Sequence, residues 1–325
     1  MRRQLSIVFL AAVFFTVNIY AEGSGGFSGS FLRVGLGARA LAMGNAQVAT
    51  ADHGHGVYYN PAALPDLKNR YLTLSYSSMS LDRKFNFIGF SLPLPPVAGA
   101  SIGWINSGVG NLRAYNSNGV DVGEVNHGLN AIYAAFALRI IALAQKDKQL
   151  ANLPPDLISI GVAVKILRED LDDKADFNYK GRGFGIDLGA LLKPHPKLTI
   201  GYQLKDMNAG LKSNTNDLFE RGSDLDNAFP LTQKAGLYYH TPLNWLSVAY
   251  DFEWNNKGTS KHHLGAELSS SIAYGRLGYD NDHLTLGGGL EFKAYKKLYM
   301  TLDYAFVDSV IDEGISHVFT WQFLF

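Results

Sequence analysis

From Tyr71 to the end of the chain, apolar and polar residues alternate with a period of two. In one such run Leu246, Val248 and Tyr250 are separated by Ser247 and Ala249. This alternation places the two sets on opposite faces of a β-strand. Most runs have the length of about ten residues that a tilted strand needs to cross a bilayer. Fourteen runs begin near residues 71, 84, 97, 128, 157, 181, 197, 231, 245, 261, 271, 283, 297 and 315. The pattern predicts an all-β protein, a transmembrane antiparallel β-barrel of about 14 strands.

The connectors between these runs alternate in length. Outer-membrane barrels have short periplasmic turns and longer extracellular loops, so this parity places both ends of the wall in the periplasm. We expect a helical turn in 141–156, a long connector on the periplasmic side, whereas 280–282 is short for an outer loop. The tight connectors include 94–96, 194–196, 241–243, 270–271 and 294–296, and the longer polar ones are 107–126, 168–180, 205–230 and 307–314.

A soluble many-stranded protein is the alternative to the barrel. One face of many strands is almost entirely aliphatic or aromatic, while the other carries Gly, Ser, Thr and scattered charge. A soluble sandwich needs no such even strand length. In lipid every backbone N–H and C=O must be paired, which only closure of the sheet achieves. The pattern therefore favours the outer membrane of a Gram-negative-type bacterium, with its lipids as the surroundings of the wall.

The last run ends the chain on aromatic residues. The set Phe319, Trp321, Phe323 and Phe325 alternates with other residues, and Phe325 is the final residue. This ending resembles the signal that the outer-membrane insertion machinery reads, although an ordinary amphipathic strand could end in the same way. At the other end, Arg2, Arg3 and the apolar stretch 5–17 predict a signal peptide over residues 1–21. The stretch is short for a membrane anchor, which is the alternative. The predicted organisation is a signal peptide at 1–21, an N-terminal segment at 22–67 and a barrel at 68–325.

Composition excludes several classes of function. The 325 residues include 29 basic and 29 acidic side chains, so no basic field suggests a nucleic-acid partner. The chain has no cysteine, which excludes disulfides, thiolate metal sites, cysteine nucleophiles and a lipid-modified N-terminal cysteine. The pairs His53/His55 and His262/His263 lack further ligands, so we expect polar loop or rim histidines rather than a metal site. No Ser/His/Asn spacing singles out a triad, and 287–289 (Gly-Gly-Gly) lies inside an alternating run. We therefore expect neither an enzyme nor a cofactor.

Charged residues occur on the polar faces of several strands. A charge inside a barrel survives where water or a partner satisfies it. Two interpretations remain open: a wet interior that solvates these charges, or acids that pair with Arg33 and Arg39 of the N-terminal segment. The charges expected to face the lumen are Lys165, Asp187, Asp251, Glu253, Glu267, Arg276, Glu291 and Asp303.

The N-terminal segment does not have the pattern of a strand. Residues 31–46 are dense in Ala and Gly, and small residues permit close packing against a surrounding wall. Pro61 biases Asn60 away from the helical region, so the chain turns there. The motif residues are Arg33, Gly37, Arg39, Met43, Gly44, Asn60, Pro61 and Ala62.

These motifs resemble the N-terminal signature of the PorV/PorQ family, which is related to the FadL-type transporters. The resemblance continues weakly in 188–189, 265–267 and 276–279, and departs at Asn45 and Ala63, where the family more often has Gly. It implies a fourteen-stranded barrel with the N-terminal segment plugging the lumen. In that family PorV and PorQ serve type IX secretion, and FadL relatives move hydrophobic molecules from outside into the barrel wall.

Two functions follow from the resemblance. The first is a PorV/PorQ-type protein associated with secretion or cargo binding at the cell surface, with secretion-system components or secreted cargo as partners. The alternative is a FadL-like channel for uptake of hydrophobic small molecules. A general diffusion porin is disfavoured, because a segment of small residues inside the lumen would block the pore.

Overall fold

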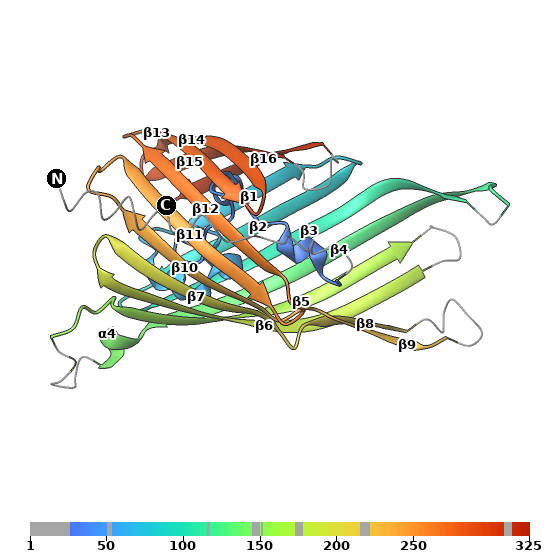
Figure 1. Cartoon of the computed structure of the whole chain (residues 1–325), viewed down its shortest axis with the longest axis horizontal. Helices are drawn as coiled ribbons and strands as arrows, with labels where there is room; N and C mark the ends of the chain where they lie inside the picture. Colours follow the sequence, from blue (N-terminus) through green and yellow to red (C-terminus); the bar gives the residue numbers. More distant parts are fainter. Residues whose placement is uncertain are drawn as a thin grey trace.

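The computed structural model describes residues 27–50, 54–115, 118–144, 150, 152–172, 178–214, 222–308 and 314–325. The predicted signal peptide and His53 lie outside these residues. Fourteen strands form a closed antiparallel barrel, and two more form a hairpin beyond its wall (Figure 1). Among the described residues, no helix is both long and apolar enough to span a bilayer. The strands of the wall are β1 (Tyr71–Ser78), β2 (Arg83–Leu94), β3 (Ala98–Tyr115), β4 (Asp121–Arg139), β5 (Ile158–Asp172), β6 (Asn178–His195), β7 (Leu198–Met207), β10 (Thr232–His240), β11 (Leu246–Asn255), β12 (Ser260–Ser269), β13 (Ala273–Asp280), β14 (His283–Tyr295), β15 (Leu298–Asp308) and β16 (Ile315–Leu324).

The barrel closes between the first strand and the last. Tyr71 of β1 lies opposite Ser91 of β2 on one side and Leu324 of β16 on the other. Closure pairs the backbone of the whole wall, as a bilayer requires. The predicted number of strands is confirmed. Every predicted start lies within three residues of the observed one except that of β4, which begins seven residues earlier, at Asp121.

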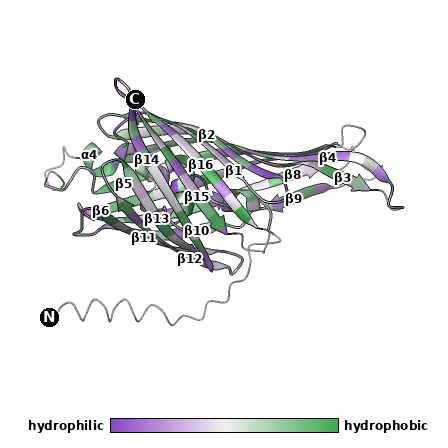
Figure 2. Ribbon diagram, turned by 90° about the horizontal axis from the view of Figure 1, so that it is seen from above, coloured by the Kyte–Doolittle hydropathy of each residue, from purple (hydrophilic) through white to green (hydrophobic). Residues whose placement is uncertain are grey.

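The two faces of the wall are those that the alternation predicts. Along β11, Ser247, Ala249 and Asp251 are buried, while Val248 is 37% exposed on the outer face. Apolar and polar residues alternate along the strands of the wall (Figure 2). The outer face carries large apolar side chains that water would disfavour and lipid accommodates. They include Ile102, Ile132, Ile160, Ile166, Leu188, Leu264, Leu277, Leu286 and Leu302.

The predicted loops 107–126, 168–180 and 205–230 are partly wrong. β3 continues to Tyr115 and β4 begins at Asp121, so these strands reach 18 and 19 residues, against 8 in β1. At about 3.3 Å per residue they extend roughly 30 Å beyond the shorter strand. β5 and β6 extend likewise, and 205–230 contributes β8 (Gly210–Asn214) and β9 (Asp224–Ala228), which continue the sheet from β6. These strand extensions, here called ribbons, are rich in polar residues and lack the alternation that marks a membrane-spanning strand. Strands that pair in water need no apolar face.

The remaining elements are short helices. α4 (Ile140–Ala144) follows β4, which confirms the helical turn expected in 141–156. The N-terminal segment forms η1 (Ser30–Arg33), α2 (Ala38–Ala42), α3 (Gly56–Tyr59) and η2 (Pro61–Asp66). α2 packs against β13–β16, and η2 packs against β2–β6. The described part of the segment therefore contacts strands from both ends of the chain.

Candidate functional site: the barrel lumen

The N-terminal segment approaches the wall at glycines. Gly161 of β5 lies against Pro61, and a methyl group there would overlap the Pro61 backbone. Gly201 of β7 is as close to the Val48 carbonyl. Only a residue without Cβ permits such an approach. Other wall glycines in the same position relative to the segment are Gly99, Gly189, Gly265, Gly278 and Gly287.

The Asn60-Pro61-Ala62 motif ties the segment to itself and to the wall. The fully buried Asn60 amide donates to the carbonyls of Val48 (2.8 Å) and Ala190 (3.2 Å). Its Oδ1 accepts from the Ala62 N–H at 3.0 Å. Asn60 thus caps η2, and Pro61 occupies the first helical position, where no N–H is needed. The motif fixes the segment where it turns beneath β5–β7.

Gly37 and Gly44, the two glycines among the motif residues, lie at the two ends of α2. Gly37 and Gly44 have φ of 84° and 61°, a region that favours glycine. The Gly44 N–H donates to Thr285 Oγ1 at 3.2 Å, and the Ala38 N–H donates to Thr320 Oγ1 at 2.8 Å. Met43 between them is fully buried against Gly265. Threonines of the wall therefore satisfy N–H groups at both ends of this short helix.

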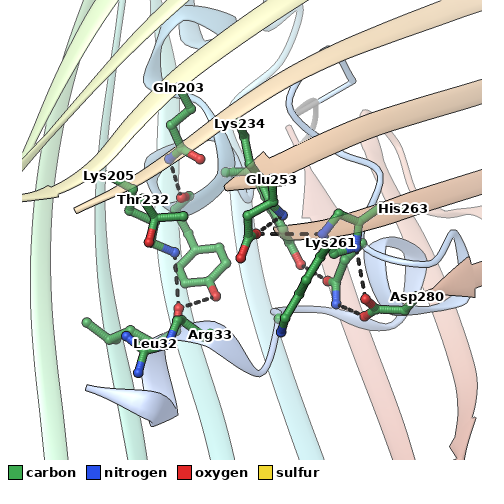
Figure 3. A pocket seen from close by; sticks show the side chains of 14 residues that line it. Leu32, Arg33, Gln203, Lys205, Thr232, Lys234, Glu253, Lys261, His263 and Asp280 are labelled. Atoms are coloured by element: carbon green, nitrogen blue, oxygen red, sulfur yellow. Dashed lines mark hydrogen bonds and ion pairs between the residues drawn. The ribbon is translucent and has the colours of Figure 1, made fainter. Parts of the chain in front are cut away.

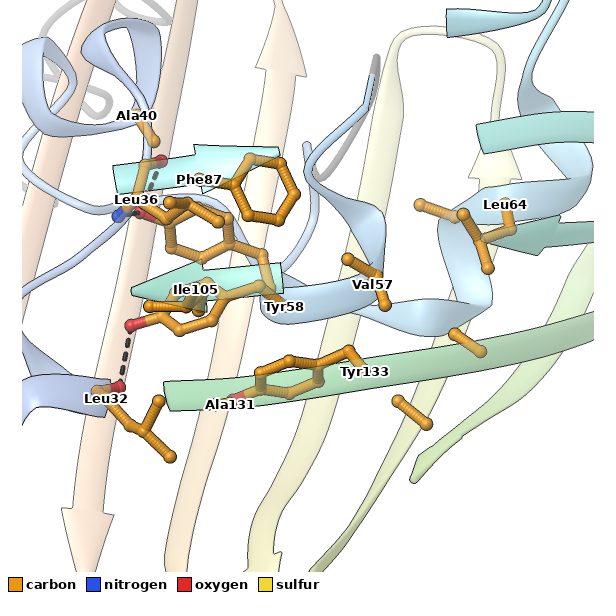
Figure 4. Packing of buried hydrophobic residues seen from close by; sticks show 14 of the residues in the cluster. Leu32, Leu36, Ala40, Val57, Tyr58, Leu64, Phe87, Ile105, Ala131 and Tyr133 are labelled. Carbon is orange, nitrogen blue, oxygen red and sulfur yellow. Dashed lines mark hydrogen bonds between the residues drawn. The ribbon is translucent and has the colours of Figure 1, made fainter. Parts of the chain in front are cut away.

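Apolar side chains of the segment form one cluster with those of the wall (Figure 4). Tyr58 donates to the Leu32 carbonyl at 2.7 Å, which joins α3 to η1. Phe87 and Ile105 on the wall are buried in the same cluster, as is Tyr133. The interior near β2–β5 is therefore packed and largely apolar.

Six of the eight charges expected to face the lumen are buried inside the barrel, and the other two, Glu253 and Glu291, are half-buried. Lys165 of β5 donates to Asp187 of β6 at 2.6 Å and to Asp206 of β7 at 2.5 Å. Asp251 of β11 accepts from the backbone N–H groups of Gln47 and Val48 at 2.7 and 2.8 Å. Asp251 thus binds the backbone of the N-terminal segment, a role that neither interpretation of the sequence anticipates.

A second group of charges links α2 to β12, β13 and β15. Arg39 donates to both carboxylate oxygens of Glu267, at 2.9 and 3.0 Å. Arg276 donates to Glu267 at 2.6 Å and to Asp303 at 2.6 Å. The structure therefore brings Arg39 together with an acid of the wall, as one of the two interpretations expects.

Arg33 differs from that expectation. Its guanidinium donates to the carbonyls of Phe27 and Ser28, at 3.1 and 3.0 Å, and forms no ion pair with a described acid. Its Nε and Nη1 are buried without a hydrogen-bond partner among the described residues. Burial lowers the pKa of Arg33 from its usual value. Arg33 is also one of the residues that line a cavity.

This cavity has a volume of about 40 Å³ and lies between the segment and β7, β10–β13 (Figure 3). Its wall residues belong to the strand ends farthest from Tyr71 and Phe325, which the lengths of the connectors predict to be the extracellular ends. Basic side chains outnumber acidic ones four to two around it: Arg33, Lys205, Lys234 and Lys261 against Glu253 and Asp280. The volume suits about three water molecules or one small polar group.

Few carboxylates oppose the cations of the cavity. Lys234 pairs with Glu253 at 2.9 Å. The Lys205 ammonium donates to the Leu32 carbonyl at 3.1 Å and lies 3.5 Å from the centre of the Tyr58 ring. The sequence pattern predicts a loop that begins at Lys205, whereas in the structure Lys205 lies inside the barrel on β7. The cavity is therefore an electropositive recess at the outer side of the segment.

The histidines lie apart. His263 Nδ1 contacts Asp280 and the Gly44 carbonyl, whereas His262 stacks on Tyr250 at the outer face. His55 packs beside Phe87. Among the described residues, no group of three or more His, Cys, Asp or Glu side chains is arranged to hold a metal ion.

The terminal aromatics face the lipid. Phe319 is 36% and Phe325 50% exposed, and the Phe325 ring stacks on Phe90 of β2. Trp321 and Phe323 continue the row along β16. Their recognition by the insertion machinery stays a prediction.

No protein-family model matches the sequence, and none of the curated proteins does. Solved structures match the fold. A FadL homologue from Pseudomonas aeruginosa is 11% identical, with a TM-score of 0.56 over 86% of this chain and 95% of its own. The monoaromatic hydrocarbon channel CymD is 13% identical, with a TM-score of 0.58 over 90% and 97%. The toluene transporter TodX of Pseudomonas putida is 13% identical, with a TM-score of 0.58 over 89% and 96%. The chain thus has the fold of FadL-type outer-membrane transporters.

Proposed function

We propose that the protein is an outer-membrane channel for the uptake of small, predominantly hydrophobic molecules. The fold is that of channels for such compounds. The N-terminal segment is proposed to plug the lumen, because its apolar and ionic contacts reach strands on all sides. A plugged barrel excludes free diffusion of ions and sugars, so passage requires a specific ligand and a shift of the segment.

The electropositive cavity carries the proposal further. Two buried N–H groups of Arg33 lack partners, and Lys205 has a single carbonyl acceptor among the described residues. A ligand that reaches this cavity binds most tightly if it carries a carboxylate or a similar anionic group. A charge-assisted hydrogen bond contributes about 1.5–3 kcal/mol, which is roughly tenfold or more in affinity. The preferred substrate is therefore a hydrophobic molecule with one acidic end.

Uptake by intact cells tests this proposal. Cells lacking their own hydrophobic-compound channels would express the protein and receive radiolabelled decanoate or decanol. We expect the wild type to raise initial uptake of decanoate above cells with an empty vector. The variant Arg33→Gln/Lys205→Gln should lower decanoate uptake about tenfold and leave decanol unchanged. Arg113→Gln, on the exposed ribbon, is the matched control. Uptake equal to the empty vector for both compounds would refute the channel.

A role in secretion is the second candidate. The observation that favours it is the pair of ribbons, β3–β4 and β8–β9, which extend past the lipid-facing belt and offer a surface to a protein partner. The comparisons add no support for the PorV/PorQ resemblance. If this role holds, secretion components or cargo co-purify with the wild type and are lost on deletion of 110–124, while decanoate uptake persists.

A further inference from the structure

Three cations stand side by side on the outer face of the barrel. Arg168 of β5 lies directly opposite Arg182 of β6, which lies directly opposite Lys212 of β8. Residues opposite each other in adjacent strands point to the same face and are close neighbours. Like charges in this relation destabilise a sheet unless an anion lies between them.

The row lies where the apolar belt ends. Ile166 and Phe184, opposite each other one step below Arg168 and Arg182, are 61% and 47% exposed to lipid. Two residues along a strand amount to about 7 Å. In the neighbouring strand the residue level with Arg168 is Asn130, which accepts from the indole N–H of Trp104 at 3.1 Å. Trp at this position is typical of the boundary between lipid tails and water.

Acids offset only part of this charge. Asp170 accepts hydrogen bonds from Arg168 at 2.7–3.1 Å, and Asp226 lies 3.5 Å from Lys212. Arg182 and the nearby Lys180 form no ion pair with any acid in the described part of the chain, although Asp170, which binds Arg168, lies opposite Lys180. Both are exposed, so two cations remain available at the level of the headgroups.

We propose that this row, Arg168, Arg182 and Lys212 with Lys180 beside it, binds the phosphate group of an outer-leaflet lipid. A lipid whose phosphate lies at this height has its acyl chains beside Ile166 and Phe184. Free phosphate would make no contact with these apolar residues. Arginine matches phosphate oxygens with two parallel N–H donors, and Arg182 has these donors unpaired with any acid among the described residues. The site is on the outside of the wall and does not depend on the proposed transport function.

Native mass spectrometry of the purified protein in detergent tests the site. The probes are diphosphorylated lipid A, the same lipid after enzymatic dephosphorylation, and inorganic phosphate. We compare the wild type with Arg168→Gln/Arg182→Gln/Lys212→Gln. The control, Lys293→Gln/Lys296→Gln/Lys297→Gln, removes three exposed cations at the opposite end of the barrel. Slower migration of boiled than of unheated protein on a gel verifies that each variant is folded.

We expect the wild type to retain phosphorylated lipid A about tenfold better than the dephosphorylated lipid, and the row variant to lose that preference. The control variant should behave as the wild type. Equal retention by the row variant, or an equal loss in the control, would overturn the proposal. Inorganic phosphate that displaces the lipid at comparable concentration would also overturn it, because the site would then recognise free phosphate.

Discussion

Arg39 joins the N-terminal segment to three charges of the wall, and together they form a network of four charges. Its side chain and that of Glu267 are 13% and 9% exposed, and the two groups form a bidentate pair. Glu267 also binds Arg276, which in turn binds Asp303. The two cations and two anions sum to zero, so Arg39→Ala leaves one negative charge in excess.

The free-energy cost of Arg39→Ala depends on the partners that Glu267 retains. Removing one partner of a buried ion pair costs about 3–5 kcal/mol when the other charge is stranded. Because Arg276 still binds Glu267, we expect about 1.5–3 kcal/mol, the contribution of a hydrogen bond to a charged group. That is roughly a 10- to 150-fold shift from the seated toward the released segment. The wall should remain assembled, since its backbone ladder does not involve Arg39.

Single-channel conductance in planar bilayers measures this shift, together with proteolysis of the segment in detergent. Arg39→Ala should conduct more often and lose residues 27–67 to protease sooner. Adding Glu267→Gln restores neutrality and should reverse part of the effect. Arg113→Ala breaks a fully exposed pair with Asp121, which solvent screens, and should match the wild type. Wild-type conductance and proteolysis in Arg39→Ala would show that this pair does not hold the segment.

Three further predictions concern packing, assembly and topology. Gly201→Val should displace the segment and expose it to protease. Gly275→Val should not, because a Cβ at Gly275 would have its nearest neighbour, Leu268 Cβ, at 4.0 Å; equal proteolysis of the two variants would refute the steric argument. Deleting 321–325 should leave a protease-sensitive periplasmic chain, because β16 must pair with β1. Normal insertion would show that the terminal aromatic residues serve only in packing. A tag at Asn216 should be reachable on intact cells and a tag at His195 should not, and the reverse result would invert the topology.

The wall could be predicted because lipid imposes a simple rule on it. A residue of β11 such as Val248 faces hydrocarbon and its neighbour Ala249 faces the interior, so period two is written directly in the sequence. The inward position of Asp251 and Glu267 followed from the same parity. The ends of the strands were harder to predict. Beyond the bilayer, residues near Tyr115 face water on both sides, and hydropathy no longer alternates although the ladder continues.

The partners of the inward residues could not be predicted. Parity places Lys165 inside but does not show that Asp206, from a segment read as a loop, completes its pair. The cavity was missed for the same reason, since Lys205 belonged to that loop. The wall glycines were a signal that could have been used: Gly161, Gly189 and Gly201 interrupt otherwise bulky strands at inward positions, which indicates close approach of another backbone.

The contacts of the N-terminal segment have a consequence for the order of assembly. η2 rests on β2–β6 and α2 on β13–β16, so neither half of the chain alone offers the segment its full seat. That seat exists only when β1 meets β16. On the proposal that the segment plugs the lumen, its docking and the sealing of the barrel are coupled events, because a segment left outside would have to enter a closed barrel. If the barrel closes before the segment docks, its interior stays empty. If the segment docks first, it brings the first and last strands of the sheet together.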